Sequence, residues 1–320
     1  MLNTLYLLIG VALLTAGGEL LIRGSLGIAK RANISPLLSG LVIVGFGTSM
    51  PELVVSLDAT LSGQPDIAIG NVIGSNIANI LLILGICAAI TPLAVSSISL
   101  RRDALVVTAA SFAFVLFASA GFFTLLGGAL FLIALLGYLV WAYYTEKNSS
   151  STLPPLHEAE AAEIQMIPKS AKWSSVEIIG GLILLIAGSQ VLLKGAVGIA
   201  SGLGISQAMI GLTLVAVGTS LPELTISVIA ALRKHTDVAV GNVLGSNIFN
   251  LLGILGISAI VQPMEIKGRV AAFDQWVMLG VTLLLYVFLF TGRRLGRIEG
   301  GFLLLGYVSY IGISYLYFSH

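Results

Sequence analysis

The stretch VGFGTSMPEL, residues 44–53, and its near copy AVGTSLPEL, residues 216–224, decide how this chain folds. Each places a glutamate, Glu52 or Glu223, directly after a proline inside a long apolar segment. A proline in a helix interior removes one backbone N–H and clashes with the carbonyl four residues earlier. The two stretches therefore predict helices that break beside an acidic residue, in surroundings that otherwise avoid charge.

The composition around these stretches is typical of an integral membrane protein. The 320 residues are 57% hydrophobic and only 10% charged, with a mean hydropathy of +1.02, far from the values of a soluble globular domain. Apolar runs of about 20 residues have the length that crosses a hydrocarbon core as a helix. Such spans are predicted at 2–22, 34–61, 67–92, 103–119, 122–143, 174–196, 205–232, 238–262, 271–290 and 299–318.

The chain also contains an internal repeat. Residues 40–92 and 211–263 align without a gap and are identical at 29 of 53 positions. The repeated unit holds five predicted spans, and because five is odd, consecutive copies cross the bilayer in opposite directions. We therefore predict an all-α membrane fold of ten helices in two inverted repeats, with broken helices at the midplane. The predicted parts are 1–145, a polar linker at 146–172, and 173–320.

Basic residues are distributed unevenly between the predicted loops. Thirteen of the 16 Lys and Arg residues fall in the connections after spans one, three, five, seven and nine, and the other three fall on the opposite side. By the positive-inside rule, the first set of loops is cytoplasmic. We expect a multi-pass protein of the cytoplasmic (inner) membrane, with the 146–172 linker inside and both termini outside.

Oxygen-bearing groups surround both prolines. The clash at each proline frees a backbone carbonyl, that of Gly47 or Gly218, and hydroxyls are added by Thr48, Ser49, Thr219 and Ser220. Two carboxylates deep in a bilayer need a compensating partner, and the nearby sequence offers no Lys or Arg. Hard cations such as Ca²⁺ take about six to eight oxygen ligands, so a bound cation is the expected partner.

The third and eighth spans carry the related motifs GNVIGSNIAN, residues 70–79, and GNVLGSNIFN, residues 241–250. An amide side chain offers a neutral oxygen to an ion. We interpret Asn79 and Asn250 as ligands in preference to interhelical hydrogen-bond partners. Interhelical hydrogen bonding is instead expected of Asn76 and Asn247. Elsewhere, Glu19 has Arg23 four residues later, the spacing of a helical ion pair.

The motifs G-T-S-x-P-E at 47–52 and 218–223, with G-S-N-I-x-N at 74–79 and 245–250, resemble the two alpha repeats of the sodium/calcium exchanger branch of the calcium/cation antiporter superfamily, in its minimal prokaryotic form. The resemblance spans the whole chain and implies that Glu52 and Glu223 form the central cation site. It further implies a cluster of Na⁺ and Ca²⁺ positions completed by Thr48, Ser49, Thr219, Ser220, Ser75, Ser246, Asn79 and the backbone carbonyls near Gly45 and Ala216.

One position departs from the family pattern. Several relatives carry an aspartate where this chain has Asn250, and in the potassium-dependent branch that carboxylate is associated with K⁺. The asparagine argues against K⁺ cotransport. It also leaves the predicted site with two formal negative charges and close internal symmetry.

The predicted function is antiport of Na⁺ and Ca²⁺ by alternating access, with Ca²⁺ leaving the cell. Two carboxylates neutralise one Ca²⁺, whereas several Na⁺ ions must share the same acids, so mutual exclusion couples the fluxes. Uncompensated charge would suppress movement of the empty carrier, and spans one and six are the expected gate. The expected partners are these two ions and the bilayer, with no resident cofactor, nucleic acid or obligatory protein partner.

Two other transport functions stay open. The first is H⁺/Ca²⁺ exchange, because a desolvated glutamate can carry a proton in place of a cation. A cation channel would line a permanent pore with acidic residues. An enzyme is not expected, since the sequence offers no pairing of a nucleophile with a base.

Overall fold

A computed structural model describes residues 2–32, 34, 36–94, 97–149, 170–203, 218–292 and 294–318. Segments labelled η are π-helical and continue the helices beside them. The helices of the first repeat are α1 (Leu2–Ala32), α2 (Pro36–Ser39), η1 (Gly40–Gly45), α3 (Phe46–Thr48), α4 (Met50–Leu61), α5 (Pro65–Ala78), η2 (Asn79–Leu84), α6 (Gly85–Ile90), α7 (Ser97–Ser119) and α8 (Leu125–Ser149).

The described elements of the second repeat follow a similar order. Its described helices are α10 (Ala171–Gly202), α13 (Leu221–Leu232), α14 (Thr236–Ile248), η5 (Phe249–Leu255), α15 (Gly256–Val261), η6 (Val270–Asp274), α16 (Gln275–Gly292) and α17 (Arg297–Phe318). Four two-residue strands lie at helix ends: β1 (Leu93–Ala94), β2 (Phe122–Phe123), β3 (Met264–Glu265) and β4 (Arg294–Leu295). The chain thus folds as an all-α membrane protein of two inverted five-helix repeats.

The described residues contain eight helices long and apolar enough to cross a membrane, and the bent pair 40–48 and 50–61 makes a ninth. Of the predicted span 205–232, the structure describes only residues 218–232, which include the apolar helix α13. Helix α8 continues four residues past 145, the predicted boundary of the first repeat. Most of the predicted linker, residues 150–169, lies outside the described residues.

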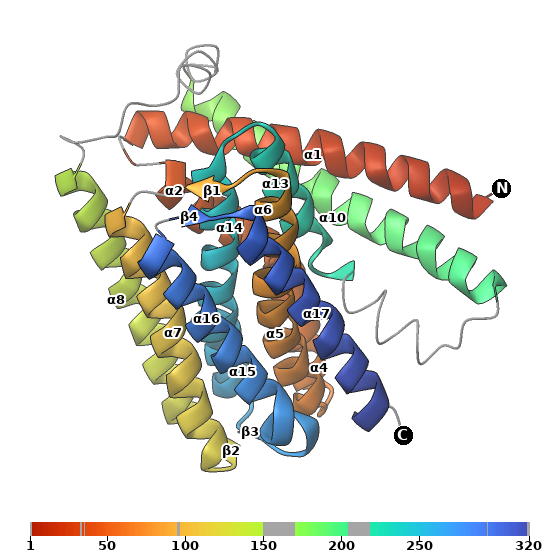
Figure 1. The fold of residues 1–320 in the computed structure, drawn as a ribbon, viewed down its shortest axis with the longest axis vertical. Helices are drawn as coiled ribbons and strands as arrows, with labels where there is room; N and C mark the ends of the chain where they lie inside the picture. The colour runs from red at the N-terminus through yellow and green to blue at the C-terminus, as the bar shows by residue number, and fades with distance from the viewer. Residues whose placement is uncertain are drawn as a thin grey trace.

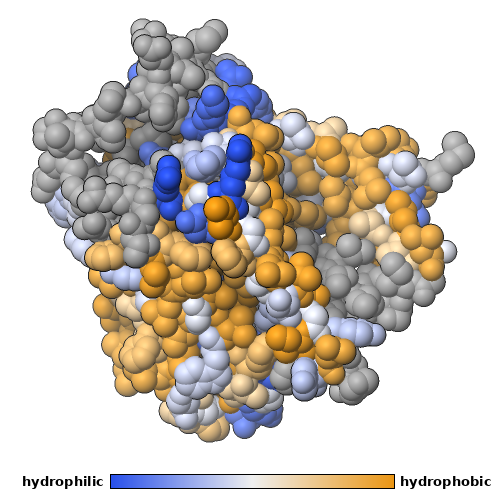
Figure 2. Space-filling view, viewed as in Figure 1, coloured by the Kyte–Doolittle hydropathy of each residue, from blue (hydrophilic) through white to orange (hydrophobic). Residues whose placement is uncertain are grey.

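Pairing of the short strands fixes which connections share an end of the bundle. β1 pairs antiparallel with β4, so the connections after spans three and nine lie together. β2 pairs with β3, so the connections after spans four and eight lie together at the opposite end. Figure 2 shows hydrophobic residues over the sides of the bundle and hydrophilic residues gathered at the end where β1 and β4 lie. This is the distribution expected of helices whose sides face lipid.

Helices α1 and α10 lie side by side at a steep angle to the other helices (Figure 1). Glycines spaced seven residues apart let the two backbones touch. A Cβ on Gly17 would lie 2.8 Å from the Gly181 carbonyl oxygen, and one on Gly24 would lie 2.7 Å from that of Ser174. Because any side chain at these positions would force the helices apart, the contact depends on glycine.

Helix α1 is longer than its predicted span and corrects one predicted contact. The predicted apolar span ends near residue 22, whereas the helix continues to Ala32 and carries Lys30 and Arg31 in its last turn, where the helix dipole favours cations. Glu19 forms its ion pair with Arg233, in the turn between α13 and α14, rather than with Arg23. Glu19 reaches Arg233 because α1 packs across this turn. Residue spacing along one helix does not reveal such a contact.

Candidate cation-binding site

The proline of the first motif stands at a break between two helices, α3 and α4, rather than at a kink inside one helix. Ser49 follows α3 with φ −82° and ψ 8°, and Ser220 precedes α13 with φ −87° and ψ 9°. Each proline is the second residue of the new helix, where a missing N–H costs no hydrogen bond. The helices on either side of Ser49 differ in direction by 45°. As a result, Glu52 and Glu223 lie in first turns, where the helix dipole favours a carboxylate.

The two proline motifs meet through hydrogen bonds between the repeats. Ser49 Oγ donates to Glu223 Oε1 at 2.9 Å, and Ser220 Oγ donates to Glu52 Oε1 at 3.4 Å. Both carboxylates are 0% exposed. Since each serine stands three residues before the glutamate of its own repeat, this exchange brings both predicted carboxylates into one site.

A cluster of oxygens extends from Glu223 along α14. Ser246 Oγ lies 3.5 Å from Glu223 Oε1 and donates to the Gly45 carbonyl at 3.0 Å. Thr48 Oγ1 lies 3.2 Å from Asn242 Oδ1 and 3.3 Å from the same carbonyl. Two predicted residues, Thr48 and Ser246, and the predicted Gly45 carbonyl therefore join one connected network with Glu223.

Not every freed carbonyl faces this network. The Gly218 carbonyl accepts a hydrogen bond from Ser189 Oγ of α10 at 2.7 Å, so this oxygen serves the packing of α10. Of the other predicted residues, Thr219 is half-buried beside Ser220, and Ser75 is buried on α5. The predicted Ala216 lies outside the described residues.

Two asparagines that the sequence analysis did not single out hold the glutamate backbones. Asn71 Nδ2 donates to the Glu52 carbonyl at 3.3 Å, and Asn242 Nδ2 donates to the Glu223 carbonyl at 3.1 Å. The same nitrogens reach Ser56 Oγ and Ser227 Oγ at 3.0 and 2.8 Å. Their occurrence in both copies of G-N-V was the sequence signal for this role.

Four asparagines from the third and eighth spans form a second set of contacts between the repeats. Asn79 Nδ2 donates to Asn247 Oδ1 and Asn250 Nδ2 donates to Asn76 Oδ1, both at 3.0 Å. The predicted interhelical role of Asn76 and Asn247 is confirmed. Asn79 and Asn250 also hydrogen-bond between helices, yet only through their nitrogens, which leaves their oxygens free for another partner.

Several buried oxygens in this region have no hydrogen-bond partner. They are Glu52 Oε2, Glu223 Oε2, Asn79 Oδ1 and Asn250 Oδ1. Buried polar atoms are normally paired, and all four of these atoms are acceptors. Among the described residues, the ion pairs of Lys and Arg go to other acids. An oxygen-lined site with two uncompensated carboxylates suits a hard cation.

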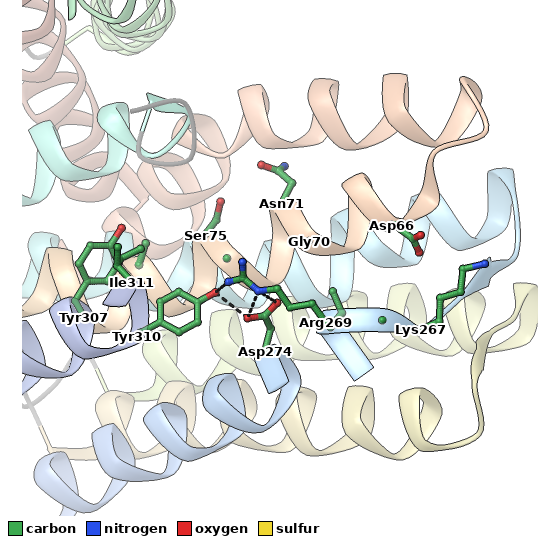
Figure 3. Close-up of a pocket in the computed structure, with 14 residues that line it drawn as sticks. Asp66, Gly70, Asn71, Ser75, Lys267, Arg269, Asp274, Tyr307, Tyr310 and Ile311 are labelled. Atoms are coloured by element: carbon green, nitrogen blue, oxygen red, sulfur yellow. Dashed lines mark hydrogen bonds and ion pairs between the residues drawn. The ribbon is translucent and has the colours of Figure 1, made fainter. Parts of the chain in front are cut away.

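A cavity of about 410 Å³ leads toward this region from the end of the molecule where β2 and β3 pair. Figure 3 shows Asn71 and Ser75 of α5 across from Arg269, Asp274 and Tyr310. Tyr310 Oη and Arg269 Nε both donate to Asp274 Oδ1, at 3.0 and 3.1 Å, and close the far wall. The charges of Arg269 and Asp274 therefore balance one another, whereas the α5 wall presents the neutral groups of Asn71 and Ser75 and, in the first turn of α5, the carboxylate of Asp66.

The corresponding positions of the other repeat are closed. A Cβ on Gly245 would lie 2.1 Å from the Leu41 carbonyl oxygen, so η1 packs directly on α14. Asn242 and Ser246 are both 0% exposed there. In contrast, Gly74, the counterpart of Gly245, lines the cavity. Among the described residues, the cavity therefore lies against α5 and reaches Asn71 and Ser75, whereas the matching face of α14 is packed against η1.

Comparison with known proteins agrees with this geometry. The family model described as "Sodium/calcium exchanger protein" matches residues 2–144 and 173–316. CaxA of Alkalimonas amylolytica is 41% identical over 320 residues, which cover 99% of this chain and 98% of the relative. The sodium/calcium exchanger MaX1 of Methanosarcina acetivorans is 31% identical, with 98% of each chain covered.

Solved structures give the same result. A structure of the sodium-calcium exchanger NCX_Mj, soaked with zero Na⁺ and Ca²⁺, superposes with a TM-score of 0.82 at 34% identity. The match covers 97% of this chain and 98% of that one. Other structures of the same exchanger were soaked with Na⁺ and either Ca²⁺ or Sr²⁺. From the family match, the relatives and the shared fold, the chain belongs to the sodium/calcium exchanger family of membrane transporters.

Proposed function

We propose that this chain is a secondary active antiporter that exchanges Na⁺ for Ca²⁺ across the cytoplasmic membrane by alternating access. The observation that carries the proposal is the pair of fully buried carboxylates, each with one oxygen lacking a partner and neither paired with a described Lys or Arg. Charged groups in lipid surroundings need compensation. A transported cation supplies that compensation here.

The proposed ligands come from both repeats. Glu52 and Glu223 provide the charge at the centre of the site. Neutral oxygens around them come from the side chains of Thr48, Ser49, Thr219, Ser220, Ser75, Ser246, Asn79 and Asn250 and from the carbonyls of Gly45 and Ala216. Such a set can supply the about six to eight oxygens that Ca²⁺ takes, and it can also be divided into smaller subsites for Na⁺.

Coupling between the two ions follows from the charge of the site. One Ca²⁺ balances both carboxylates, whereas Na⁺ ions must share the same oxygens, so the two kinds of ion exclude each other. An empty site would carry two uncompensated charges through a low-dielectric region, which is costly. The carrier therefore changes state only when it is loaded, and this restriction makes exchange obligatory.

Alternating access would use the contact between the tilted pair α1 and α10 and the rest of the bundle. We propose that the β2–β3 end faces outward, because the loops at the opposite end carry most of the Lys and Arg residues. The cavity beside α5 is then the external approach, and sliding of α1 and α10 would open the α14 side. The expected net direction is Ca²⁺ out and Na⁺ in.

H⁺/Ca²⁺ exchange is the second candidate, and the same unpartnered carboxylate oxygens support it, since each could hold a proton. The two functions differ in the ion that drives Ca²⁺. Purified protein in proteoliposomes should take up ⁴⁵Ca²⁺ when the lumen holds Na⁺ and the bath does not. A pH gradient of equal size, without Na⁺, should drive little uptake.

Two results would contradict the proposal. Uptake that follows the pH gradient and ignores Na⁺ would favour H⁺/Ca²⁺ exchange. Uptake that needs no counter-ion and stops only when the Ca²⁺ gradient is spent would indicate a channel. Empty liposomes and liposomes with the Glu52→Gln variant are the matched controls, because they separate leak from transport through the site.

A further inference from the structure

The four asparagines between the third and eighth spans are arranged in crossed pairs. Asn247 Oδ1 accepts from Asn79 Nδ2, and Asn76 Oδ1 accepts from Asn250 Nδ2, at 3.0 Å in each case. The acceptor asparagines are fixed in turn, because Asn76 Nδ2 donates to the Asn247 carbonyl at 3.3 Å and Asn247 Nδ2 donates to the Asn76 carbonyl at 3.4 Å. Each acceptor therefore has both ends of its amide engaged.

This engagement determines which way the outer amides point. An amide can rotate by a half turn and exchange its oxygen for its NH₂ group with little change in shape. With Nδ2 bound to an acceptor, the oxygens of Asn79 and Asn250 are left buried and without a partner. All four side chains are at most 1% exposed, so bulk water does not reach them to replace the acceptor.

The geometry points to Asn76 and Asn247 as positioning residues that hold the amides of Asn79 and Asn250 with oxygen, not nitrogen, toward the transported cation. This inference rests on the proposed cation site. The pairing crosses the repeats: Asn247 lies three residues from Asn250 in the sequence but orients Asn79, and Asn76 lies three residues from Asn79 but orients Asn250. Without its acceptor, a ligand amide could turn its N–H groups toward a positive ion, which they repel.

The crossed pairing allows a test that separates orientation from packing. Asn247→Leu keeps a side chain of similar size and removes the acceptor for Asn79. Outer-shell partners of ligands typically contribute about 10–100-fold to metal affinity, so Ca²⁺ binding by purified protein should weaken about tenfold or more. Asn76→Leu, the matched variant of the other repeat, should have a similar effect through Asn250.

The decisive measurement repeats these changes with a carboxylate as the ligand. A carboxylate has two oxygens and no wrong orientation, so in an Asn79→Asp background Asn247→Leu should weaken Ca²⁺ binding by less than about threefold. In an Asn250→Asp background the loss should stay at about tenfold. For Asn76→Leu the pattern should be reversed, because its partner is Asn250. The loss should be less than about threefold in the Asn250→Asp background and about tenfold in the Asn79→Asp background.

Equal losses in both aspartate backgrounds would overturn the inference, since a packing defect does not depend on the identity of the ligand. Wild-type affinity in Asn247→Leu would overturn it as well. If Asn247→Leu does not yield a monodisperse protein, Asn247→Ala takes its place in the same comparison. Failure of the proposed function gives a different result, because wild-type protein would then bind no Ca²⁺ and the aspartate backgrounds would not change this.

Discussion

At the residue scale, Glu52 and Glu223 each combine one oxygen bonded to a serine of the other repeat with one oxygen that has no partner. A carboxylate held in this way is fixed in position without being neutralised. The serine hydrogen bond orients the group, and the free oxygen keeps the charge available for a ligand. This division explains why each motif places a serine three residues before its glutamate.

Glu52→Gln and Glu223→Gln should each abolish exchange while the protein still inserts and folds. Removing one partner of a buried charge interaction costs about 3 kcal/mol or more, which corresponds to about a 100-fold loss of Ca²⁺ affinity. Counterflow of ⁴⁵Ca²⁺ in proteoliposomes measures the effect. Glu299→Gln is the control, because this acid accepts the Gly296 N–H next to β4, at the end of the molecule opposite the cavity. Near-normal counterflow in either glutamine variant would refute the site.

Asn250→Asp should change ion preference by adding a third negative charge beside the site. We expect tighter Ca²⁺ binding and a new response to K⁺, because a higher ligand charge can balance an additional monovalent ion. Competition of K⁺ with ⁴⁵Ca²⁺ binding measures this, and Asn79→Asp, at the equivalent position of the other repeat, is the matched comparison. Unchanged selectivity in Asn250→Asp would show that this side chain does not contact the ion.

Much of the site could be predicted at the residue scale because each ligand type occurs twice. The repeated G-T-S-x-P-E motif predicted that two acids, two prolines and four hydroxyl groups belong together. It could not predict which serine bonds which glutamate, because the exchange between Ser49 and Ser220 depends on how the repeats pack. The roles of Asn71 and Asn242 were missed for the same reason, since their partners are backbone carbonyls of another helix.

At the scale of elements, glycine determines how closely the helices approach. On α10, a Cβ at Gly181 would lie 2.7 Å from the Leu21 nitrogen and 2.8 Å from the Gly17 carbonyl oxygen of α1. The neighbouring Gly180 has no described atom within 4 Å of the same position. One glycine is therefore required by contact between two backbones, and the other is not.

Gly181→Ala should destabilise the protein and slow exchange, whereas Gly180→Ala should not. An extra methyl group in a tight contact costs about 1–3 kcal/mol, and the clash is with backbone, which cannot rotate away. Gly180→Ala removes a helix-weakening glycine and should gain up to about 1 kcal/mol. Thermal unfolding of detergent-solubilised protein and the initial rate of exchange measure both effects. Equal behaviour of the two variants would show that α1 and α10 do not depend on this contact.

The bounds of the elements were predicted less well than their existence. Hydropathy marks where a helix leaves the apolar core, so it predicted an end at residue 22, but α1 continues to Ala32 because backbone hydrogen bonding does not stop at the membrane surface. The π-helical segments η2 and η5 also have no signal in an apolar sequence. They start at Asn79 and Phe249, beside both predicted amide ligands, where π-helical turns often accompany functional sites.

At the scale of the whole molecule, the two repeats differ at one ion pair that joins the tilted helices to the bundle. Glu19 of α1 pairs with Arg233, which follows α13. The positions that correspond to these residues in the other repeat are Gln190 and Ser62, which cannot form an ion pair. Among the described residues, this link is found at the end where α14 begins and not at the corresponding positions of the other repeat, and movement of α1 against the bundle would stretch it.

Arg233→Gln should consequently shift the protein away from the state described here, in which the cavity beside α5 is open. A partly exposed ion pair contributes about 0–1 kcal/mol, so the ratio of the two states should change by up to about fivefold.

Gly70 lines that cavity with no described atom within 4 Å of a built Cβ, and the native Cys87 is 0% exposed. In a Gly70→Cys background, labelling by a membrane-impermeant maleimide from the β2–β3 side should therefore slow when Arg233 is replaced. Lys234→Gln, which removes the same charge from the same turn at an exposed position, should leave the rate unchanged. Identical labelling rates in the two variants would mean that the ion pair holds α1 in place without favouring either state.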